Sequence, residues 1–284
     1  MERGLVVADH SRATHYLGFI GYYRLSGYYR YFADYKDDRL EKFRDGVTFE
    51  RVLALYIFDR KLRGLITDAL ERIEIAVKAT MSNAACLSAG PSWLCNPANF
   101  DYNRHPEIME ILEDALSSKG GKYKHIFLNH FFTKYSDEHP PAWMIMEALS
   151  FGSFSKIFKL AKGEFRSPVG DAFGVHPTVI ESWLHALVFV RNVCAHHGRL
   201  WNRTFTITPK IPKRYSGEWP NASQDKLYIV CCIIHHMLSV LADDTGWATR
   251  LKELISQRPD VPLSAMGFPN EWESIPFWNA KLKT

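Results

Sequence analysis

Apolar residues recur at helical spacing from Thr48 to about Ala85. Seven of them keep this spacing over seven turns: Val52, Leu55, Leu62, Ile66, Ala69, Ile73 and Val77. Such a stripe is typical of a helix that packs one face against a core. Thr48 is a good N-cap residue, and Glu50 places a negative charge in the first turn. The pattern therefore predicts a long central helix that begins after Thr48.

Two charged residues interrupt this apolar stripe. Asp59 stands where an apolar residue is due, and Arg63 follows one turn later. A buried carboxylate needs partners. Either the two side chains pair with each other as an i,i+4 couple, or they reach a polar site elsewhere in the fold.

Shorter helical patterns follow, and Pro and Gly residues separate them. Gly90-Pro91 and Pro140-Pro141 interrupt the helical pattern, and Pro177 fits the first position of a helix. The predicted helices cover residues 107–117, 123–135, 142–149, 153–161, 179–191 and 227–241, the last with Ser223 as its cap. The alternating run 204–208 predicts at most a short β element near residues 203–209.

No linker or composition shift divides the chain, so a single mainly α domain over residues 1–284 is the economical prediction. Within it we distinguish three parts. They are an N-terminal segment rich in aromatic residues and arginine (1–47), a helical core (48–245), and a C-terminal helix and loop (246–284).

Composition agrees with a soluble, folded protein. Hydrophobic residues make up 46% and charged residues 23%, which excludes a disordered chain. The N-terminus lacks the apolar region of a signal peptide, and the longest apolar run is too short to cross a membrane. Five cysteines show no disulfide-like framework, so we expect a cytoplasmic protein with no membrane association.

A short repeat near the N-terminus combines tyrosine and arginine. Gly21-Tyr22-Tyr23-Arg24 recurs six residues later as Gly27-Tyr28-Tyr29-Arg30. A shift of six residues corresponds to 240° on a helix, so the two copies face different ways. One interpretation is a pair of aromatic packing elements around a break. The other is a surface on which Tyr23, Arg24, Tyr29 and Arg30 bind unpaired bases.

The stretch 190–203 has an unusual composition: three arginines, two histidines, two asparagines and no acidic residue. Arg191, Asn192, His196 and His197 are its candidate catalytic residues. Arg191 and His196 would be about 140° out of phase on a continuous helix, so they share a face only if the helix ends between them or if a second chain completes the pair. Gly198 makes such an end plausible.

The chemistry that these residue types suit is RNA cleavage without a metal. A histidine that titrates near neutrality can move the proton of a 2′-hydroxyl. A guanidinium that is always charged can hold the phosphate, and Asn192 would orient either group. The alternative is structural: Arg191 and Asn192 cap a helix end while His196 and His197 bond to buried carbonyls. The residues alone leave both interpretations open.

A basic run follows this stretch. Between residues 199 and 217 there are five basic residues and no acidic one: Arg199, Arg203, Lys210, Lys213 and Arg214. This is the densest positive segment of the chain, and we assign it as a candidate RNA-binding surface.

A zinc site is a weaker alternative. Cys231, Cys232, His235 and His236 lie in one apolar helix, and Cys194 with His196 and His197 could complete a site. However, the paired cysteines typical of structural zinc sites are missing, and small cysteines fit an apolar core. We therefore expect no metal and no cofactor.

Several stretches of the chain resemble the Abi family of bacterial abortive-infection proteins, of the AbiD and AbiF type. They are residues 21–28, 48–49, 55–63, 69–76, 149–152 and 266–272, together with Trp143, Glu147 and the signature from Arg191 to Asn202. The resemblance implies a HEPN-like helical bundle with additional helices and loops. It also implies a metal-independent endoribonuclease centre at Arg191, Asn192 and His196, with His197 as a runner-up.

The same resemblance implies an antiphage function, a 2′,3′-cyclic phosphate product, a homodimer and RNA as a partner, including a structured non-coding RNA. Two other functions remain open from the sequence. One is an RNA-binding module that grips RNA without cutting it, and the other is a protein-binding regulator of a toxin–antitoxin pair.

Overall fold

The computed structural model describes residues 3–34, 42–119, 122–213, 219–243, 245–258 and 260–279. Its α-helices are α1 (His10–Ile20), α2 (Tyr22–Phe32), α3 (Phe49–Ala89), α4 (His105–Leu116), α5 (Ile126–Lys134), α6 (Ala142–Ala148), α7 (Phe151–Leu160), α8 (Gly163–Ala172), α9 (Pro177–Ala195), α10 (Leu227–Leu241) and α11 (Trp247–Ser256). Short 3₁₀ helices are η1 (Trp93–Cys95), η2 (Pro97–Asn99), η3 (Tyr102–Arg104), η4 (Leu263–Met266), η5 (Trp272–Ser274) and η6 (Pro276–Trp278). The mainly α fold predicted from the sequence is confirmed.

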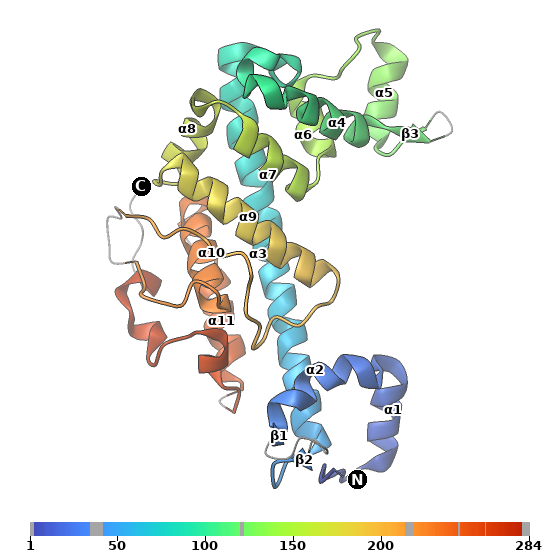
Figure 1. Cartoon of the computed structure of the whole chain (residues 1–284), viewed down its shortest axis with the longest axis vertical. Helices are drawn as coiled ribbons and strands as arrows, with labels where there is room; N and C mark the ends of the chain where they lie inside the picture. Colours follow the sequence, from blue (N-terminus) through green and yellow to red (C-terminus); the bar gives the residue numbers. More distant parts are fainter. Residues whose placement is uncertain are drawn as a thin grey trace.

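Helix α3 is the axis of the molecule. Its 41 residues give it a length of about 60 Å, and Figure 1 shows it running from α1 and α2 at one end to α4 and α6 at the other. Thr48 caps its N-terminus by accepting a 3.1 Å hydrogen bond from the backbone N–H of Arg51, as predicted. The apolar stripe is buried along the whole helix.

The other helices pack around this axis. Helices α2, α6, α8, α9, α10 and α11 all contact α3, and α9 crosses it obliquely in Figure 1. Helix α7 packs on α9. Because α3 touches both α2 and α9, it brings the N-terminal segment close to the polar stretch that follows α9. The three-part division of the chain stays a prediction, since these contacts do not test it.

Residues 204–208 form no strand, which agrees with the prediction of at most a short β element there. The strands of the described chain have two residues each and pair as two hairpins: β1 (Ala33–Asp34) with β2 (Lys42–Phe43), and β3 (Ser118–Lys119) with β4 (Lys122–Tyr123). Ser223 does not cap α10, because its hydroxyl bonds to Asp225 and the cap position is Lys226. Helix α8 is present in a segment where no helix was predicted.

The membrane prediction can be compared with the described helices. Within the described part of the chain, no single helix has the length and apolar character needed to cross a membrane. Helices α8 and α9 meet that criterion only together, as a pair bent by 78°.

Candidate functional site

Helix α9 carries the polar stretch at its C-terminal end. Pro177 occupies the first position, and His176 caps the N-terminus by accepting a hydrogen bond from Thr178. One face of the helix is buried through Ile180, Trp183, Leu184, Leu187 and Val190. The helix ends at Ala195, between Asn192 and His196 as predicted, but too late along the chain to turn His196 onto the face of Arg191.

A Schellman motif ends the helix at the two histidines. The backbone N–H of Gly198 donates to the carbonyl of Val193 at 2.7 Å, and the N–H of His197 donates to that of Cys194 at 3.0 Å. His197 takes the left-handed position, with φ 55°, which in this motif is usually a glycine. Gly198 follows where a Cβ would lie only 3.1 Å from atoms of Val193.

The left-handed backbone at His197 makes a prediction about stability. A β-branched residue is strained there, whereas glycine is not. The free energy of unfolding of His197→Val should therefore be lower than that of His197→Gly by at least about 1 kcal/mol. Urea unfolding measures the difference. Equal stabilities for the two variants would contradict the assigned conformation.

The turn divides the stretch into an exposed and a buried part. Arg191, Asn192, His196 and His197 are exposed, whereas Leu200 and Trp201 are fully buried. Burial raises the pKa of the intervening Cys194 thiol to about 11, so this cysteine is unreactive at neutral pH. In the described chain, the side chains of His196 and His197 make no hydrogen bond to a buried carbonyl. The structural interpretation of these two histidines requires such bonds.

A buried polar cluster fixes the turn to α3. The two oxygens of Asp59 accept hydrogen bonds from the backbone N–H groups of Leu200 (3.1 Å) and Trp201 (2.7 Å) and from the hydroxyl of Tyr28 (2.6 Å). Arg63 forms an ion pair with the same carboxylate and donates to the carbonyl of Gly198 at 3.4 Å. Both alternatives proposed for the charged pair are therefore realised together.

These contacts also set the charge state of the cluster. The pKa of Asp59 is raised, because the effect of burial exceeds that of the hydrogen bonds to Tyr28 and Trp201 and of the nearby Arg63, all of which lower it. Burial, together with the Asp59 carboxylate, raises the pKa of the Tyr28 hydroxyl, which therefore stays protonated as a donor. The cluster is thus an internal anchor for the residue 198–201 turn.

Arginines tie the same turn to α2. Arg24 donates to the carbonyl of His197 at 2.8 Å, and Arg199 donates to the carbonyls of Gly27 and Asn202. Arg203 donates to the carbonyl of Arg199 at 3.3 Å. Three of the arginines assigned to RNA binding, Arg24, Arg199 and Arg203, therefore have intramolecular partners. Their contact with RNA stays a prediction.

Arg191 and His196 both lie at the C-terminal end of α9. Arg191 donates to the side-chain oxygen of Asn192 at 3.2 Å, and among the described residues no hydrogen bond joins Arg191 to His196. The backbone N–H of His196 still bonds to the carbonyl of Asn192 at 3.0 Å. The two side chains therefore keep the helical phase difference of about 140°.

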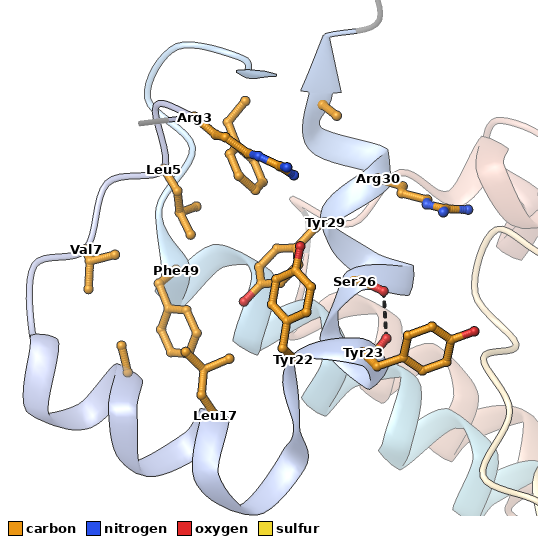
Figure 2. A pocket seen from close by; sticks show the side chains of 13 residues that line it. Arg3, Leu5, Val7, Leu17, Tyr22, Tyr23, Ser26, Tyr29, Arg30 and Phe49 are labelled. Carbon is orange, nitrogen blue, oxygen red and sulfur yellow. Dashed lines mark hydrogen bonds between the residues drawn. The ribbon is translucent and has the colours of Figure 1, made fainter. Parts of the chain in front are cut away.

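The tyrosines of the repeat divide between a cavity and the surface. The tyrosines and arginines of both copies lie in α2, since the helix break falls at Gly21, the first residue of the first copy, and not between the two copies. Tyr29 is only 8% exposed, with its ring 5.9 Å from that of Tyr22, whereas Tyr23 is 91% exposed. Figure 2 shows Tyr22 and Tyr29 side by side in a cavity of about 770 Å³, with Tyr23 and Arg30 at its edge.

Of this set, only Tyr23 presents a largely open ring for stacking on a base. Tyr22, which the sequence analysis did not select, is 62% exposed and lines the same cavity. The signal that could have selected it is its place in the first copy of the repeat. Base binding by Tyr23, Arg24, Tyr29 and Arg30 stays a prediction.

The basic run lies in an extended segment beside α9. The indole N–H of Trp183 donates to the carbonyl of Lys210 at 2.9 Å, and the N–H of Lys210 donates to the hydroxyl of Ser182 at 2.8 Å. Lys210 and Lys213 are exposed, and Arg214 lies outside the described residues. The segment ends beside a groove of about 640 Å³ between α7 and α9, which is lined by both Lys210 and Asn192.

The cysteines and histidines of α10 belong to the core. Cys231 and Cys232 are fully buried, His236 bonds to the carbonyl of Phe173 at 2.8 Å, and His235 bonds to that of Phe277 at 3.2 Å. Within the described chain, no group of three or more His, Cys, Asp or Glu side chains is arranged to hold a metal ion. His235 and His236, two of the residues weighed for zinc, therefore have other partners here.

The buried histidines predict a dependence of stability on pH. Burial lowers the pKa of His235 to about 4, from a model-peptide value of about 6.5, and also lowers that of His236. The unfolded chain therefore binds protons that the folded chain does not. Stability should be full above about pH 6.5 and fall towards pH 4, by about 3 kcal/mol for His235. Urea unfolding over this range measures the free energy of unfolding at each pH. If His235→Gln had the same slope of this free energy against pH as the wild type, the assignment would be contradicted.

Comparison with known proteins gives the family of the chain. The fold and the polar helix end define a mainly α protein with an Arg-x4-His pair at a helix C-terminus. The chain belongs to the family of Abi-like proteins, whose profile matches residues 15–202. This membership supports a function in abortive infection, a form of defence. Nothing among the curated proteins or the solved structures matches the chain.

Proposed function

We propose that the protein is a metal-independent endoribonuclease that acts in antiphage abortive infection. The observation that carries the proposal is the end of α9. There the exposed side chains of Arg191 and Asn192 stand on the last turn of the helix and that of His196 at its cap, and a buried cluster around Asp59 fixes the turn that follows them. Catalytic groups need a rigid support, which the anchored turn supplies.

In the proposed reaction, the 2′-oxygen of a ribose attacks the adjacent phosphorus. His196 takes the proton of the 2′-hydroxyl, or delivers one to the leaving oxygen. The bond from phosphorus to the 5′-oxygen breaks, which gives a 2′,3′-cyclic phosphate and a 5′-hydroxyl. Arg191 compensates the charge on the phosphate oxygens, and Asn192 orients the guanidinium through their 3.2 Å hydrogen bond.

This reaction needs a second group for proton transfer. His197 is one candidate, since it follows His196 and is also exposed. The other is His196 of a second copy of the chain. A homodimer with α9 at its interface would bring Arg191 of one subunit to His196 of the other, which overcomes their phase difference of about 140° within one helix.

RNA is the proposed substrate and partner, and a structured non-coding RNA is included among its binding partners. The cytoplasm is the proposed place of action. The protein would then act on cellular or phage RNA once an infection triggers it.

The experiment that tests the proposal compares two RNAs of one sequence. Purified protein is incubated in EDTA with an all-ribose single strand and with its 2′-O-methyl copy. The proposal predicts cleavage of the first and not of the second, because the nucleophile is blocked in the second. Intact all-ribose RNA, or equal cleavage of both strands, would refute it.

A further inference from the structure

The groove between α7 and α9 leads to the candidate site. It is lined from α7 by Lys156 and Lys159, from α9 by His185 and Asn192, and from the extended segment by Lys210. We propose that this groove holds the sugar–phosphate backbone of single-stranded RNA and directs it to His196. The inference rests on the proposed function and deepens it by assigning the path of the substrate.

The geometry of α9 aligns the groove with the site. Thr178, His185 and Asn192 all line the groove and are separated by seven residues each, which displaces the side chains by only about 20° per step. His196 lies four residues further, which adds about 40°. The same stripe of α9 that forms the wall of the groove therefore ends at the candidate catalytic histidine. From Thr178 to Asn192 it extends about 21 Å.

The two other walls of the groove are fixed by packing. A Cβ on Gly152 would lie 3.7 Å from Val188, so the start of α7 lies beside the C-terminal half of α9. Across the groove, Trp183 and Ser182 hold the backbone of Lys210 with hydrogen bonds of 2.9 and 2.8 Å. The hydrogen bond from the buried indole of Trp183 therefore fixes the backbone of Lys210 at the rim of the groove.

Charge and chemistry favour a polyanion. Lys156, Lys159 and Lys210 are exposed, and none forms an ion pair within the described chain. Glu181, an acidic residue of the lining, pairs with Arg166 at 2.5 Å. Glu107 lies near Lys156 and Lys159, but its pKa is lowered first by its hydrogen bond to Arg104.

Hydroxyl groups complete the lining of the groove. They belong to Ser150, Ser153, Ser155, Thr178 and Ser182. Hydroxyls donate to phosphate oxygens and to sugar oxygens without selecting a base, and lysine binds phosphate as a point charge. A lining of lysines and hydroxyls without exposed large aromatic rings fits the backbone of a strand better than its bases.

The salt dependence of binding tests this path. The probe is a fluorescein-labelled 2′-O-methyl oligouridine, which the proposed reaction cannot cut. Fluorescence anisotropy gives its affinity for the protein over a range of salt concentrations. The variant Lys156→Gln/Lys159→Gln/Lys210→Gln should bind more weakly, and its slope of log affinity against log salt should be shallower by about 2, since each lost phosphate contact removes about 0.7.

The control removes three exposed lysines outside the groove, Lys61→Gln/Lys122→Gln/Lys124→Gln, and should retain the slope of the wild type. Equal loss in both variants, or no binding of the probe by the wild type, would overturn the groove assignment. Cleavage of all-ribose RNA is scored separately. If binding depends on the groove lysines but all-ribose RNA stays intact, the groove assignment stands and the proposed nuclease activity is refuted.

Discussion

Replacing Asp59 with alanine should destabilise the protein by about 3 to 5 kcal/mol, because the substitution leaves a buried charge without its partner. Arg63 is only 6% exposed and has its ion pair with Asp59. The N–H groups of Leu200 and Trp201 would lose their acceptor as well. Urea unfolding followed by circular dichroism measures the difference in the free energy of unfolding from wild type.

Asp68→Ala is the matched control, since Asp68 stands on the same helix. Its carboxylate pairs with Arg250 at 2.8 Å, but both side chains are nearly half exposed, and such surface pairs contribute less than about 1 kcal/mol. If the two alanine variants were equally stable, the anchoring role of Asp59 would be wrong. Asp59→Asn, which keeps an acceptor but no charge, should fall between wild type and Asp59→Ala.

Replacing His196 with alanine should reduce the rate of RNA cleavage by about 10²- to 10⁴-fold, the usual contribution of a general acid or base. Its side chain is exposed at the end of α9, so stability should change by less than about 0.5 kcal/mol. Initial rates on all-ribose RNA, with a thermal melt of each variant, separate the two effects. The control is His10→Ala, which removes an exposed histidine at the start of α1.

If Arg191 of one subunit acts with His196 of the other, inactive chains should restore one another. Arg191→Ala and His196→Ala chains mixed under conditions that exchange subunits should recover about a quarter of the wild-type activity, since half of the dimers are mixed and each holds one intact site. No recovery would contradict this pairing of Arg191 and His196 across two subunits.

Much of the frame that holds the site follows from the sequence. Thr48 and the apolar stripe predict α3, and Asp59 within that stripe indicates a buried polar contact before its partner is known. The position of Gly198 predicts the end of α9. The left-handed residue, however, is His197, because the glycine occupies the next position of the Schellman motif, where close approach to Val193 requires it.

Features that depend on tertiary packing do not follow from local patterns. In the run 204–208, Phe205 is buried and its neighbours Thr204 and Thr206 are exposed, as in a strand. The cause is packing of its ring against Phe189 of α9, at 5.9 Å, without a partner strand. Similarly, Lys156 and Lys159 resemble an ordinary solvated helix face until α7 is placed beside α9.

The chemistry of the cut ends tests the central claim most directly. All-ribose RNA is incubated in EDTA with wild type and with His196→Ala, and the termini of the products are mapped. We predict 2′,3′-cyclic phosphate and 5′-hydroxyl ends with wild type and almost no product with His196→Ala. Ends with a 5′-phosphate, or cleavage that the His196 substitution leaves unchanged, would contradict the assignment of the end of α9 as a metal-independent ribonuclease centre.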